Sequence, residues 1–486
     1  MFRGRSVSDE RLRRGDAGVA VGPAARPGIV HIGLGAFHRA HQAVYTDAAL
    51  RAHGGDWGIV AVAPRSPDVV TAVNEQDGLF SVTTLSAAPP RTDVVGSVVA
   101  AMHLPTQGTA VLDLLADPAT RVVTLTVTEK AYLIDAAGRL LDDDELRADL
   151  STDRPPRTVI GLLARALRAR AAAGGPPLAL VSCDNLPANG QRLRSALTQA
   201  LGAEPGEWVS FPCTMVDRIV PASTPETYAR AAAALGRVDR AAVDAEPFSQ
   251  WVIEDDPGDP TRYFPGGRPA WEAGGAIFSE HVPAYERLKL RMLNGVHSTL
   301  AYLGCLAGAP TIRDALALPE MRPFIDKLMY DDIAPTLTAP PGVSLAAYGA
   351  SVLERFANPA IGHRTLQVAM DGSQKLPQRI FATVAERRAA GAEPAYLAVS
   401  LAAWIRFLGG VADDGRPLPL NDPLAGPLRS ALAAAGDDPA EQVRAVFQVA
   451  AVAPDGLADD SALVGLVAER LRTLRRVGVA GLLADV

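Results

Sequence analysis

The sequence predicts an α/β N-terminal domain followed by a mainly α-helical C-terminal domain. Two observations lead to this prediction. Short apolar segments rich in β-branched residues alternate with helical patterns up to about residue 284, and beyond it alanine and leucine dominate in helical patterns such as EPAYLAVSLAAWIRFLGG (393–410). Alternating strands and helices are typical of a parallel sheet covered by helices on both faces. We therefore predict a first domain at residues 1–284 and a second domain at residues 285–486.

Five apolar segments are the candidate strands of the first domain. Most are short and end in glycine, proline or asparagine, as expected of buried strands that lead into turns. They are GIVHIGLG, WGIVAVAP, RVVTLTVTEKAY, LALVSCDNLPANG and EWVSFPCTMVDRIVP, which begin at residues 28, 57, 121, 178 and 207. The segment 155–174 is predicted to be a helix. Residues 1–27 are expected to be a polar lead-in, and residues 254–271, rich in proline, glycine and aspartate, a loop.

The composition excludes several classes of function. The chain of 486 residues has a formal net charge of −7 and its basic residues are spread along its length, so we expect no nucleic-acid partner. The N-terminus has no apolar signal segment and no run of about 18 uncharged apolar residues occurs, so we expect neither secretion nor a membrane span. Three cysteines without metal-ligand spacing fit a reducing cytoplasm. We expect a cytoplasmic protein without a metal site.

Gly33 and Gly35 follow the first candidate strand and precede a predicted helix, which is the context of a dinucleotide-binding turn. The first glycine permits a tight turn, and the second allows a pyrophosphate to approach the backbone. His38 stands where the usual pattern has a third glycine. Asp68 is the candidate acid for binding the ribose, but Arg65 nearby would favour a 2′-phosphate instead. The residues therefore leave NAD and NADP as alternatives.

The segment KLRMLNGVHS (289–298) places polar side chains among apolar neighbours. Lys289, Asn294 and His297 can share one broad face if the segment is a regular α-helix. A lysine in apolar surroundings loses its proton more easily and can act as a general base. An amide donor can stabilise an oxygen that becomes anionic as hydride leaves, and a histidine can hold a second substrate oxygen. Gly295 weakens a helix, which suggests that another segment packs closely there.

Asn185 adds a second asparagine to this set. It follows the fourth candidate strand, and open α/β sheets bind their ligands at the carboxyl ends of their strands. Each residue also has a purely structural interpretation: a lysine that reaches solvent, a core histidine, and an asparagine in a turn. The second asparagine favours the catalytic interpretation.

Longer blocks of the sequence resemble one family. KLRMLNGVH is similar to the K-x₄-N-x₂-H signature of the polyol-specific long-chain dehydrogenases, the mannitol dehydrogenase family. The resemblance continues through HIGLGAFHRAHQ, TLTVTEKAY, SCDNLPANG, FPCTMVDRIVPAS, EPFSQWVIED and AMDGSQKLPQR, and it covers about residues 28–450. It implies a metal-free secondary-alcohol dehydrogenase with a Rossmann-type N-terminal domain, a helical C-terminal domain and an active site between them.

The resemblance also implies a role for each matching residue. The catalytic positions are Lys289 as general base, Asn185 and Asn294 as the oxyanion-stabilising pair, His297 as a substrate contact and Glu286 as a proton relay. The substrate-binding positions are Val216, Asp217 and Lys375. The cofactor-binding positions are Gly33, Gly35, Phe37 and Asp68.

One position departs from the mannitol 2-dehydrogenase pattern. That branch has an arginine eight residues before the lysine that matches Lys375, and this chain has Gln367 there. The surrounding blocks resemble the fructuronate reductase, or D-mannonate oxidoreductase, branch more closely. A uronate needs a cation beside its carboxylate, which Lys375 or Lys130 would supply; the mannitol branch has glycine at the position of Lys130. The resemblance thus implies D-fructuronate and D-mannonate as substrates, with D-fructose and D-mannitol, or another polyol such as arabinitol, as the alternative.

Two other classes of function compete with this hypothesis. A nucleotide-binding module without catalysis would keep the glycine turn, but it would not need the lysine, the two asparagines and the histidine together. A methyltransferase can also have a glycine-rich first turn, yet it would leave the same residues without a role. Members of the family are often monomers or dimers, so we expect a monomer or a weak dimer.

Overall fold

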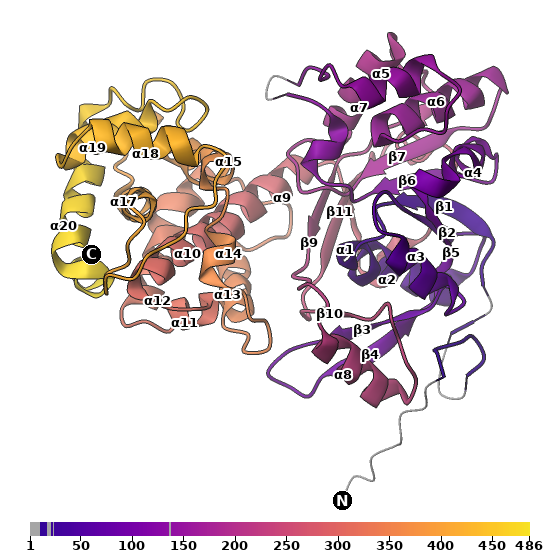
Figure 1. The fold of residues 1–486 in the computed structure, drawn as a ribbon, viewed down its shortest axis with the longest axis horizontal. Helices are drawn as coiled ribbons and strands as arrows, with labels where there is room; N and C mark the ends of the chain where they lie inside the picture. Colours follow the sequence, from indigo (N-terminus) through magenta and orange to yellow (C-terminus); the bar gives the residue numbers. More distant parts are fainter. Residues whose placement is uncertain (1–9, 17–20, 23, 136–137) are drawn as a thin grey trace, which may run out of the picture. The chain divides into compact units, whose positions relative to one another are not determined.

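The computed structural model describes four stretches of the chain, residues 10–16, 21–22, 24–135 and 138–486. The chain divides into two compact units, Met1–Pro283 (unit 1) and Ala284–Val486 (unit 2), which are seen in Figure 1. All strands of the described residues lie in unit 1, and unit 2 is helical. The predicted fold class, an α/β domain followed by a mainly α-helical domain, is confirmed.

A six-stranded sheet forms the centre of unit 1. All of its strands are parallel, and their order is β5-β2-β1-β6-β7-β8. Their bounds are β1 Pro27–Ile32, β2 Gly58–Ala63, β5 Val98–His103, β6 Val122–Leu125, β7 Leu178–Ser182 and β8 Val209–Ser210. The strand order reverses between β1 and β6, and open α/β sheets bind nucleotides at the carboxyl ends of the strands beside such a reversal.

Helices and two small sheets complete unit 1. The helices are α1 Ala36–Ala40, α2 Gln42–His53, α3 Pro67–Asn74, α4 Leu104–Ala116, α5 Asp144–Ser151, α6 Val159–Ala172, α7 Asn189–Leu201 and α8 Pro225–Leu235, with the 3₁₀ turns η1 Glu129–Tyr132 and η2 Trp271–Gly274. One small sheet consists of β10 Val243–Ala245, β3 Phe80–Thr84 and β4 Arg91–Val95. The other consists of β12 Ile277–Ser279, β11 Gln250–Glu254 and β9 Thr214–Asp217.

The central strands are buried on both faces. On β1, Ile29 belongs to an apolar cluster that includes residues of α2, whereas Val30 and Ile32 belong to a second cluster with residues of α4 and α6. Successive side chains of a strand point to opposite faces, so each face of the sheet has its own layer of helices. This double burial explains why the central strands appear in the sequence as continuous apolar runs.

The fifth candidate segment, residues 207–221, forms two strands that belong to different sheets. β8 ends at Ser210 and is parallel to β7, whereas β9 begins at Thr214 and is antiparallel to β11. Pro212 lies between them and lacks the N–H group that a continuous strand would use. The segment therefore joins the central sheet to the small sheet that contains β9.

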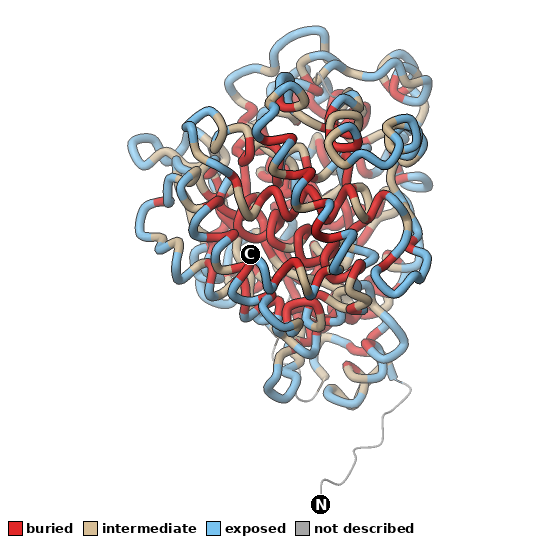
Figure 2. Tube along the Cα trace, turned by 90° about the vertical axis from the view of Figure 1, so that its left-hand side faces the viewer, coloured by how far each residue is buried: buried red, intermediate tan, exposed pale blue. Residues whose placement is uncertain are grey.

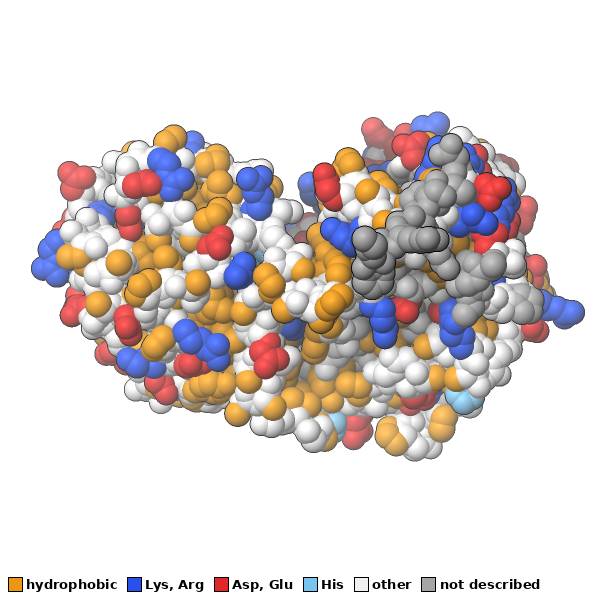
Figure 3. All heavy atoms as spheres, turned by 90° about the horizontal axis from the view of Figure 1, so that it is seen from below, with side chains coloured by type: hydrophobic (Ala, Val, Ile, Leu, Met, Phe, Trp, Pro, Cys, Tyr) orange, Lys and Arg blue, Asp and Glu red, His pale blue; other side chains and the backbone are white. Residues whose placement is uncertain are grey.

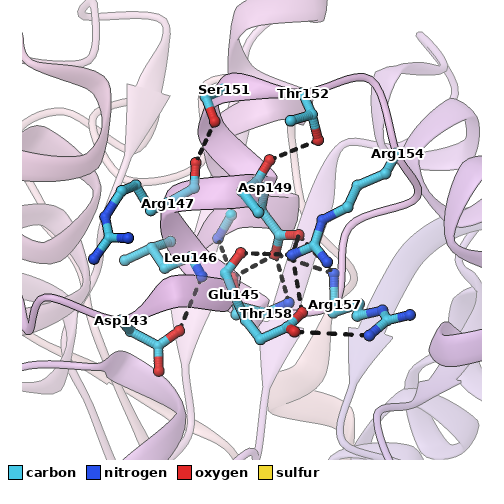
Figure 4. A network of polar contacts seen from close by, with 12 residues as sticks. Asp143, Glu145, Leu146, Arg147, Asp149, Ser151, Thr152, Arg154, Arg157 and Thr158 are labelled. Carbon is cyan, nitrogen blue, oxygen red and sulfur yellow. Dashed lines mark hydrogen bonds and ion pairs between the residues drawn. The ribbon is translucent and has the colours of Figure 1, made fainter.

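The start of α6 is fixed by a buried carboxylate (Figure 4). Asp149 on α5 is fully buried and accepts hydrogen bonds from the backbone N–H groups of Arg157 and Thr158 and from the Thr158 hydroxyl. The guanidinium of Arg154 lies 3.1 Å from the same carboxylate. Thr158 is in turn the N-cap of α6. These contacts explain why the helix predicted at 155–174 begins only after Thr158.

Part of the predicted polar lead-in packs against unit 1. Leu12 is fully buried, and the guanidinium of Arg14 donates to the carbonyl oxygens of Gly22, Gly96 and Val98. The polar composition of this segment gave no sign that Leu12 would be buried. The first nine residues of the lead-in lie outside the described part of the chain.

Unit 2 is built around three helices, α10 Val296–Ala307, α17 Ala395–Leu408 and α20 Ser461–Asp485, which pack against one another. α10 and α17 are buried along most of their length, and Figure 2 shows buried residues in the interior of the molecule and exposed residues along its edge. The helix predicted at 393–410 is α17. The other helices are α9 Val282–Leu288, α11 Ile312–Leu316, α12 Met321–Lys327, α13 Leu345–Phe356, α14 Thr365–Val368, α15 Gly372–Leu376, α16 Ala382–Ala389, α18 Ala425–Ala434 and α19 Pro439–Phe447, with the 3₁₀ turn η5 Ala334–Thr336.

Three segments of unit 2 are π-helical, with backbone hydrogen bonds between residues five apart instead of four. They are η3 Lys289–Gly295, η4 Leu328–Ile333 and η6 Pro377–Phe381. π-Helical turns are rare and are frequent at functional sites. The first of them carries two of the predicted catalytic residues.

Figure 3 shows basic and acidic side chains interspersed with apolar ones on the face in view. No helix in the described part of the chain is long and apolar enough to span a bilayer. All three cysteines are buried and unbridged. Among the described residues, no three His, Cys, Asp or Glu side chains are grouped so that they could hold a metal ion.

Candidate functional site

The turn between β1 and α1 requires glycine at position 33. Gly33 has a φ of +118°, and a Cβ atom at this position would lie 2.2 Å from the carbonyl oxygen of Thr126. The Gly33 N–H donates to the carbonyl oxygen of Val62 at 2.8 Å. Gly35 is exposed and is the N-cap of α1. Only glycine combines this conformation with so close an approach, and the exposed backbone at Gly35 is accessible to a ligand.

His38 stands where the usual pattern has a third glycine, and its ring stacks on that of another histidine. Its ring lies on that of His31 on β1, with the ring centroids 3.4 Å apart. His31 Nδ1 lies 2.7 Å from Thr124 Oγ1, and His31 Nε2 lies 2.9 Å from Thr126 Oγ1. Burial lowers the pKa of His31 to about 3, so this ring is neutral. The two flat rings supply the close contact between helix and strand that a third glycine usually permits.

A cavity of about 230 Å³ lies at the carboxyl ends of β1, β2 and β6. Its lining includes Gly33, Gly35, Arg65 and Ser66. Asp68 does not line it; this exposed residue of the first turn of α3 lines a neighbouring cavity of about 700 Å³, which shares Ser66. The position of the smaller cavity and the glycine turn fit a bound dinucleotide. The structure thus places a basic residue in the cavity and the predicted acid beside it.

Phe37, the remaining residue predicted on the cofactor side, is half-buried on α1. Its ring stacks on that of His41, with the ring centroids 4.9 Å apart, and packs against the apolar cluster on one face of the sheet. Phe37 is absent from the lining of the smaller cavity. In the structure as it stands, its contacts are therefore those of a packing residue.

A buried carboxylate connects the loops that carry Asn185 and Lys130. These two exposed residues follow the ends of the neighbouring strands β7 and β6. Asp184 accepts hydrogen bonds from the Thr128 N–H and from the Tyr132 hydroxyl, each at 2.8 Å. Burial is the main reason that the pKa of Asp184 is raised. Asp184 thus fixes the loop with Lys130 to the strand end with Asn185.

Val216 and Asp217 are the last two residues of β9, and both are buried. Asn189 joins β9 to the end of β7. Its side-chain NH₂ donates to the carbonyl oxygens of Asp184 and Thr214, and its side-chain oxygen accepts from the Thr214 N–H at 2.9 Å. The substrate-side residues predicted in unit 1 therefore stand on three segments that buried polar side chains hold together.

Lys289 and Asn294 lie in one π-helical turn, η3. Both are buried, with 9% and 8% of their surface exposed. The regular α-helix on which their common face was predicted is not formed here. A π-turn contains more residues than an α-turn, so residues five apart lie closer to one face than they would in an α-helix. The spacing of Lys289 and Asn294 therefore suits the π-turn.

Gly295 ends this π-turn and lies against a second one, η6. A Cβ atom on Gly295 would lie 3.0 Å from the carbonyl oxygen of Arg379, so the expectation that a segment packs closely against this glycine is confirmed. Arg291 makes a further fixed contact of η3. Its guanidinium donates to both carboxylate oxygens of Glu386 and to the hydroxyl of Thr336. These contacts hold the backbone of η3 in place.

His297 stands in the first turn of α10 and is only partly exposed. Its ring stacks on Phe356 and on His363, with ring centroids 4.9 Å and 5.3 Å away. Its Nε2 atom is buried and has no hydrogen-bond partner among the described residues. Burial, followed by the charges of neighbouring cationic groups, places the pKa of His297 well below its ordinary value. The result is a neutral imidazole with an unused nitrogen, which a ligand hydroxyl can satisfy.

The other predicted residues of unit 2 differ in exposure. Lys375, near the end of α15, is half-buried, and its ammonium donates to the carbonyl oxygen of Met370 at 2.6 Å. Burial and then the charge of Arg379 lower the pKa of Lys375. Glu286 is half-buried on α9, three residues before Lys289, and Gln367 is exposed on α14.

The scarcity of lysine in the chain distinguishes three of the predicted site residues, Lys130, Lys289 and Lys375. Of the 47 basic residues only four are lysine, at positions 130, 289, 327 and 375. Lys327 donates to the carbonyl oxygen of Val486, and the other three are predicted site residues. Arginine stays charged in proteins, whereas lysine can give up its proton. Lys130, Lys289 and Lys375 are therefore exceptions in a chain that otherwise uses arginine, as expected if a site needs an amine there; Lys327 shows that a lysine can also remain without such a need.

Two family models match the chain. The mannitol dehydrogenase Rossmann domain matches residues 27–272, and the mannitol dehydrogenase C-terminal domain matches residues 281–475. The D-mannonate oxidoreductase of Escherichia coli (strain K12) is 40% identical over 467 residues, which are 92% of this chain and 94% of that protein. The mannitol 2-dehydrogenase of Cereibacter sphaeroides is 38% identical over 429 residues, which are 86% of this chain and 88% of that protein.

Solved structures show the same relationship. The ternary complex of Pseudomonas fluorescens mannitol 2-dehydrogenase with NAD and D-mannitol is 33% identical, with a TM-score of 0.83 and coverage of 98% of this chain and 99% of that chain. A D-sorbitol dehydrogenase in substrate-free form is 31% identical, with a TM-score of 0.86 and coverage of 99% and 98%. The protein is thus an oxidoreductase that acts on CH–OH groups. It belongs to the mannitol dehydrogenase family.

Proposed function

We propose that the protein is an NAD-dependent fructuronate reductase, which interconverts D-fructuronate and D-mannonate with Lys289 as the general acid and base. The observation that carries the proposal is the placement of Lys289, buried in a π-turn with Asn294, in a chain that has almost no other lysine. The similarity to a D-mannonate oxidoreductase supports the substrate class. The glutamine at position 367, where the mannitol branch has arginine, supports it as well.

In the direction of reduction, bound NADH supplies a hydride to the carbonyl carbon of the substrate. The ammonium of Lys289 donates its proton to the carbonyl oxygen as negative charge develops there. The side-chain amides of Asn185 and Asn294 donate hydrogen bonds to the same oxygen, and these bonds strengthen as the oxygen becomes anionic. The neutral ring of His297 holds a second substrate oxygen, and Glu286 returns a proton to Lys289. In the direction of oxidation, the neutral amine of Lys289 removes the hydroxyl proton.

Unit 1 supplies the binding site for the cofactor in this proposal. Gly33 and Gly35 receive the pyrophosphate at the mouth of the cavity of about 230 Å³. The NAD in the complex of the related mannitol 2-dehydrogenase supports NAD as the cofactor. Arg65 in the cavity lining favours NADP as the alternative, because a guanidinium can bind a 2′-phosphate.

The alternative substrate pair is D-fructose and D-mannitol, or another polyol such as arabinitol. It is favoured by the similarity to mannitol 2-dehydrogenases, one of which holds D-mannitol in its solved complex. Under the uronate hypothesis, Lys130 and Lys375 are the candidate cations beside the substrate carboxylate. Lys130 stands where the mannitol branch has glycine.

Catalytic efficiency on D-fructuronate and on D-fructose, each with NADH and with NADPH, tests the proposal. We expect D-fructuronate with NADH to be the best combination. A higher efficiency on D-fructose would overturn the uronate assignment in favour of the polyol alternative. Lys289→Ala should abolish turnover and leave NADH binding, followed by its fluorescence, largely intact; near wild-type turnover in this variant would remove the general-base assignment.

A further inference from the structure

Unit 2 gathers positive charge beside His297. Arg379 on η6 donates a hydrogen bond to the hydroxyl of Ser298, the residue that follows His297, at 3.1 Å. Lys375 lies four residues before Arg379 on the same run of helical turns. Arg355 on α13 is buried. In addition to burial, the positive charges of Arg379, Arg355 and Lys375 lower the pKa of His297. Three cationic side chains from two segments of the chain therefore lie around one neutral ring.

The charge of Arg379 is not neutralised within the described residues. No carboxylate among them forms an ion pair with its guanidinium, whose hydrogen bond goes to the hydroxyl of Ser298. The negative charge of Asp422 favours the protonated form of Lys375, and Asp422 already accepts hydrogen bonds from the N–H and hydroxyl groups of Ser373. Burial lowers the pKa of Arg379 to about 10, which reflects the cost of a largely desolvated charge. A buried charge without a counter-ion is favourable only if a ligand supplies one.

His297 adds an independent sign that a ligand binds here. Its Nε2 atom is buried and unpartnered among the described residues, although buried polar atoms are normally hydrogen-bonded. The unpartnered nitrogen belongs to His297 on α10, and the guanidinium without a counter-ion belongs to Arg379 on η6, which donates to Ser298, the residue after His297. Together they match a ligand that has a carboxylate next to a hydroxyl group. A polyol has only hydroxyl groups and would leave the guanidinium without a counter-ion.

We propose that Arg379, with Lys375 beside it, binds the carboxylate of a uronate or aldonate substrate, and that His297 binds a hydroxyl group next to this carboxylate. The guanidinium fork can hold a carboxylate through two hydrogen bonds, which a hydroxymethyl group cannot accept in the same way. The inference rests on the proposed function and deepens it, because it assigns the recognition of the acid to unit 2 and not to Lys130 in unit 1.

The test compares two substrates that differ only at this group, D-fructuronate and D-fructose. Arg379→Gln should lower kcat/KM on D-fructuronate by about 10²–10³-fold, mainly through KM, and on D-fructose by less than about ten-fold. Lys130→Gly should change the ratio of the two efficiencies by less than about three-fold. The matched control is Arg429→Gln, which removes an exposed arginine of α18 and should leave both efficiencies unchanged.

The outcomes separate the inference from the function on which it rests. A wild-type enzyme that prefers D-fructose overturns the proposed function, and the inference with it. A wild-type enzyme that prefers D-fructuronate, together with equal losses on both substrates in Arg379→Gln, overturns the inference alone. If Arg379→Gln does not fold, Arg379→Lys decides, because lysine keeps the charge but lacks the fork: a selective loss on D-fructuronate supports the inference, and an unchanged efficiency contradicts it.

Discussion

Gly295 lies against the carbonyl oxygen of Arg379, and a Cβ atom on Gly295 would be 3.0 Å from this oxygen. The contact joins two π-helical turns, η3 with Lys289 and Asn294, and η6 with Arg379. Residues from distant parts of the chain therefore depend on one glycine for their relative position. Because 3.0 Å is shorter than an ordinary carbon–oxygen contact, a side chain at position 295 would displace η6 by a few tenths of an ångström.

We expect Gly295→Ala to lower kcat/KM by about ten-fold and to lower the free energy of unfolding by no more than about 2 kcal/mol. Alanine favours a helical backbone by about 1 kcal/mol over glycine. Crowding of a packed interior costs about 1–3 kcal/mol, so we expect a net loss of stability of roughly 0–2 kcal/mol. The displaced η6 still moves Arg379 away from its place beside His297. Initial rates and thermal unfolding measure the two effects separately.

Gly465→Ala is the matched control for this variant. Gly465 is an exposed glycine within α20, and a Cβ atom there has no neighbour within 4 Å. This substitution should stabilise the protein by about 0.5–1 kcal/mol and leave the rates unchanged. Full activity in both variants would contradict the coupling between the two π-turns.

Lys289→Arg should be as inactive as Lys289→Ala, although it keeps the positive charge. Arginine does not lose its proton near neutral pH, so it can neither accept a proton from the substrate hydroxyl nor return one. General acid–base catalysis contributes about 10²–10⁴-fold, and we expect a loss of this size in kcat. Lys327→Arg is the control, because Lys327 donates to the Val486 carbonyl oxygen and lies over the ring of Tyr396, and arginine can make both contacts. An active Lys289→Arg variant would show that charge alone suffices at this position.

Sequence patterns predicted five of the six strands of the central sheet; the edge strand β5, most of whose residues are only partly buried, was not among the candidate strands. β1, β2, β6 and β7 appear as continuous apolar runs, and this signal needs no knowledge of neighbouring segments. Apart from β9, which lies within the candidate segment 207–221, the strands of the small sheets were not recognised in the sequence. β4, for example, alternates exposed and covered residues, contains arginine and aspartate, and is a strand only because it pairs with β3. Such strands depend on partners that local sequence does not specify.

The candidate catalytic residues were chosen from their spacing and from the family resemblance, but the π-helical geometry of the segment that carries Lys289 and Asn294 was not predicted. A π-turn differs from an α-turn by one residue, and the contacts that fix η3 come from Arg379 and Glu386, far along the chain. Asp184, Asn189 and Arg379 were not predicted at all. They lie in the same blocks as Asn185 and Lys375, and their burial, which distinguishes a positioning residue from a surface charge, becomes apparent only in the fold.

His31→Gln should make the protein less sensitive to acid. Folded protein keeps His31 neutral down to about pH 3, whereas the unfolded chain takes up this proton near pH 6.5. Stability is therefore unaffected above pH 6.5 and is lost as the pH falls from 6.5 towards 3, by up to about 1.4 kcal/mol per pH unit. The measurement is urea unfolding at pH 7 and pH 5, followed by tryptophan fluorescence.

The difference between the two pH values should shrink in His31→Gln, even if the variant is less stable at both. His53→Gln removes an exposed histidine of the same unit and serves as the control. If His31→Gln loses as much stability as the wild type on acidification, His31 is not the neutral ring described above.

Asp68 and Arg65 should have opposite effects on the choice between NADH and NADPH. Arg65 lines the cavity at the glycine turn, and Asp68 stands beside it in the first turn of α3, where its charge repels a 2′-phosphate. We expect Asp68→Ser to lower the preference for NADH by about ten-fold, which corresponds to roughly 1.4 kcal/mol. Arg65→Gln should raise this preference. Dissociation constants from nucleotide fluorescence, determined without substrate, measure both effects. If Asp68→Ser leaves the preference unchanged and Arg65→Gln alters it, the cavity lining alone selects the cofactor, and Asp68 has no part in binding the ribose.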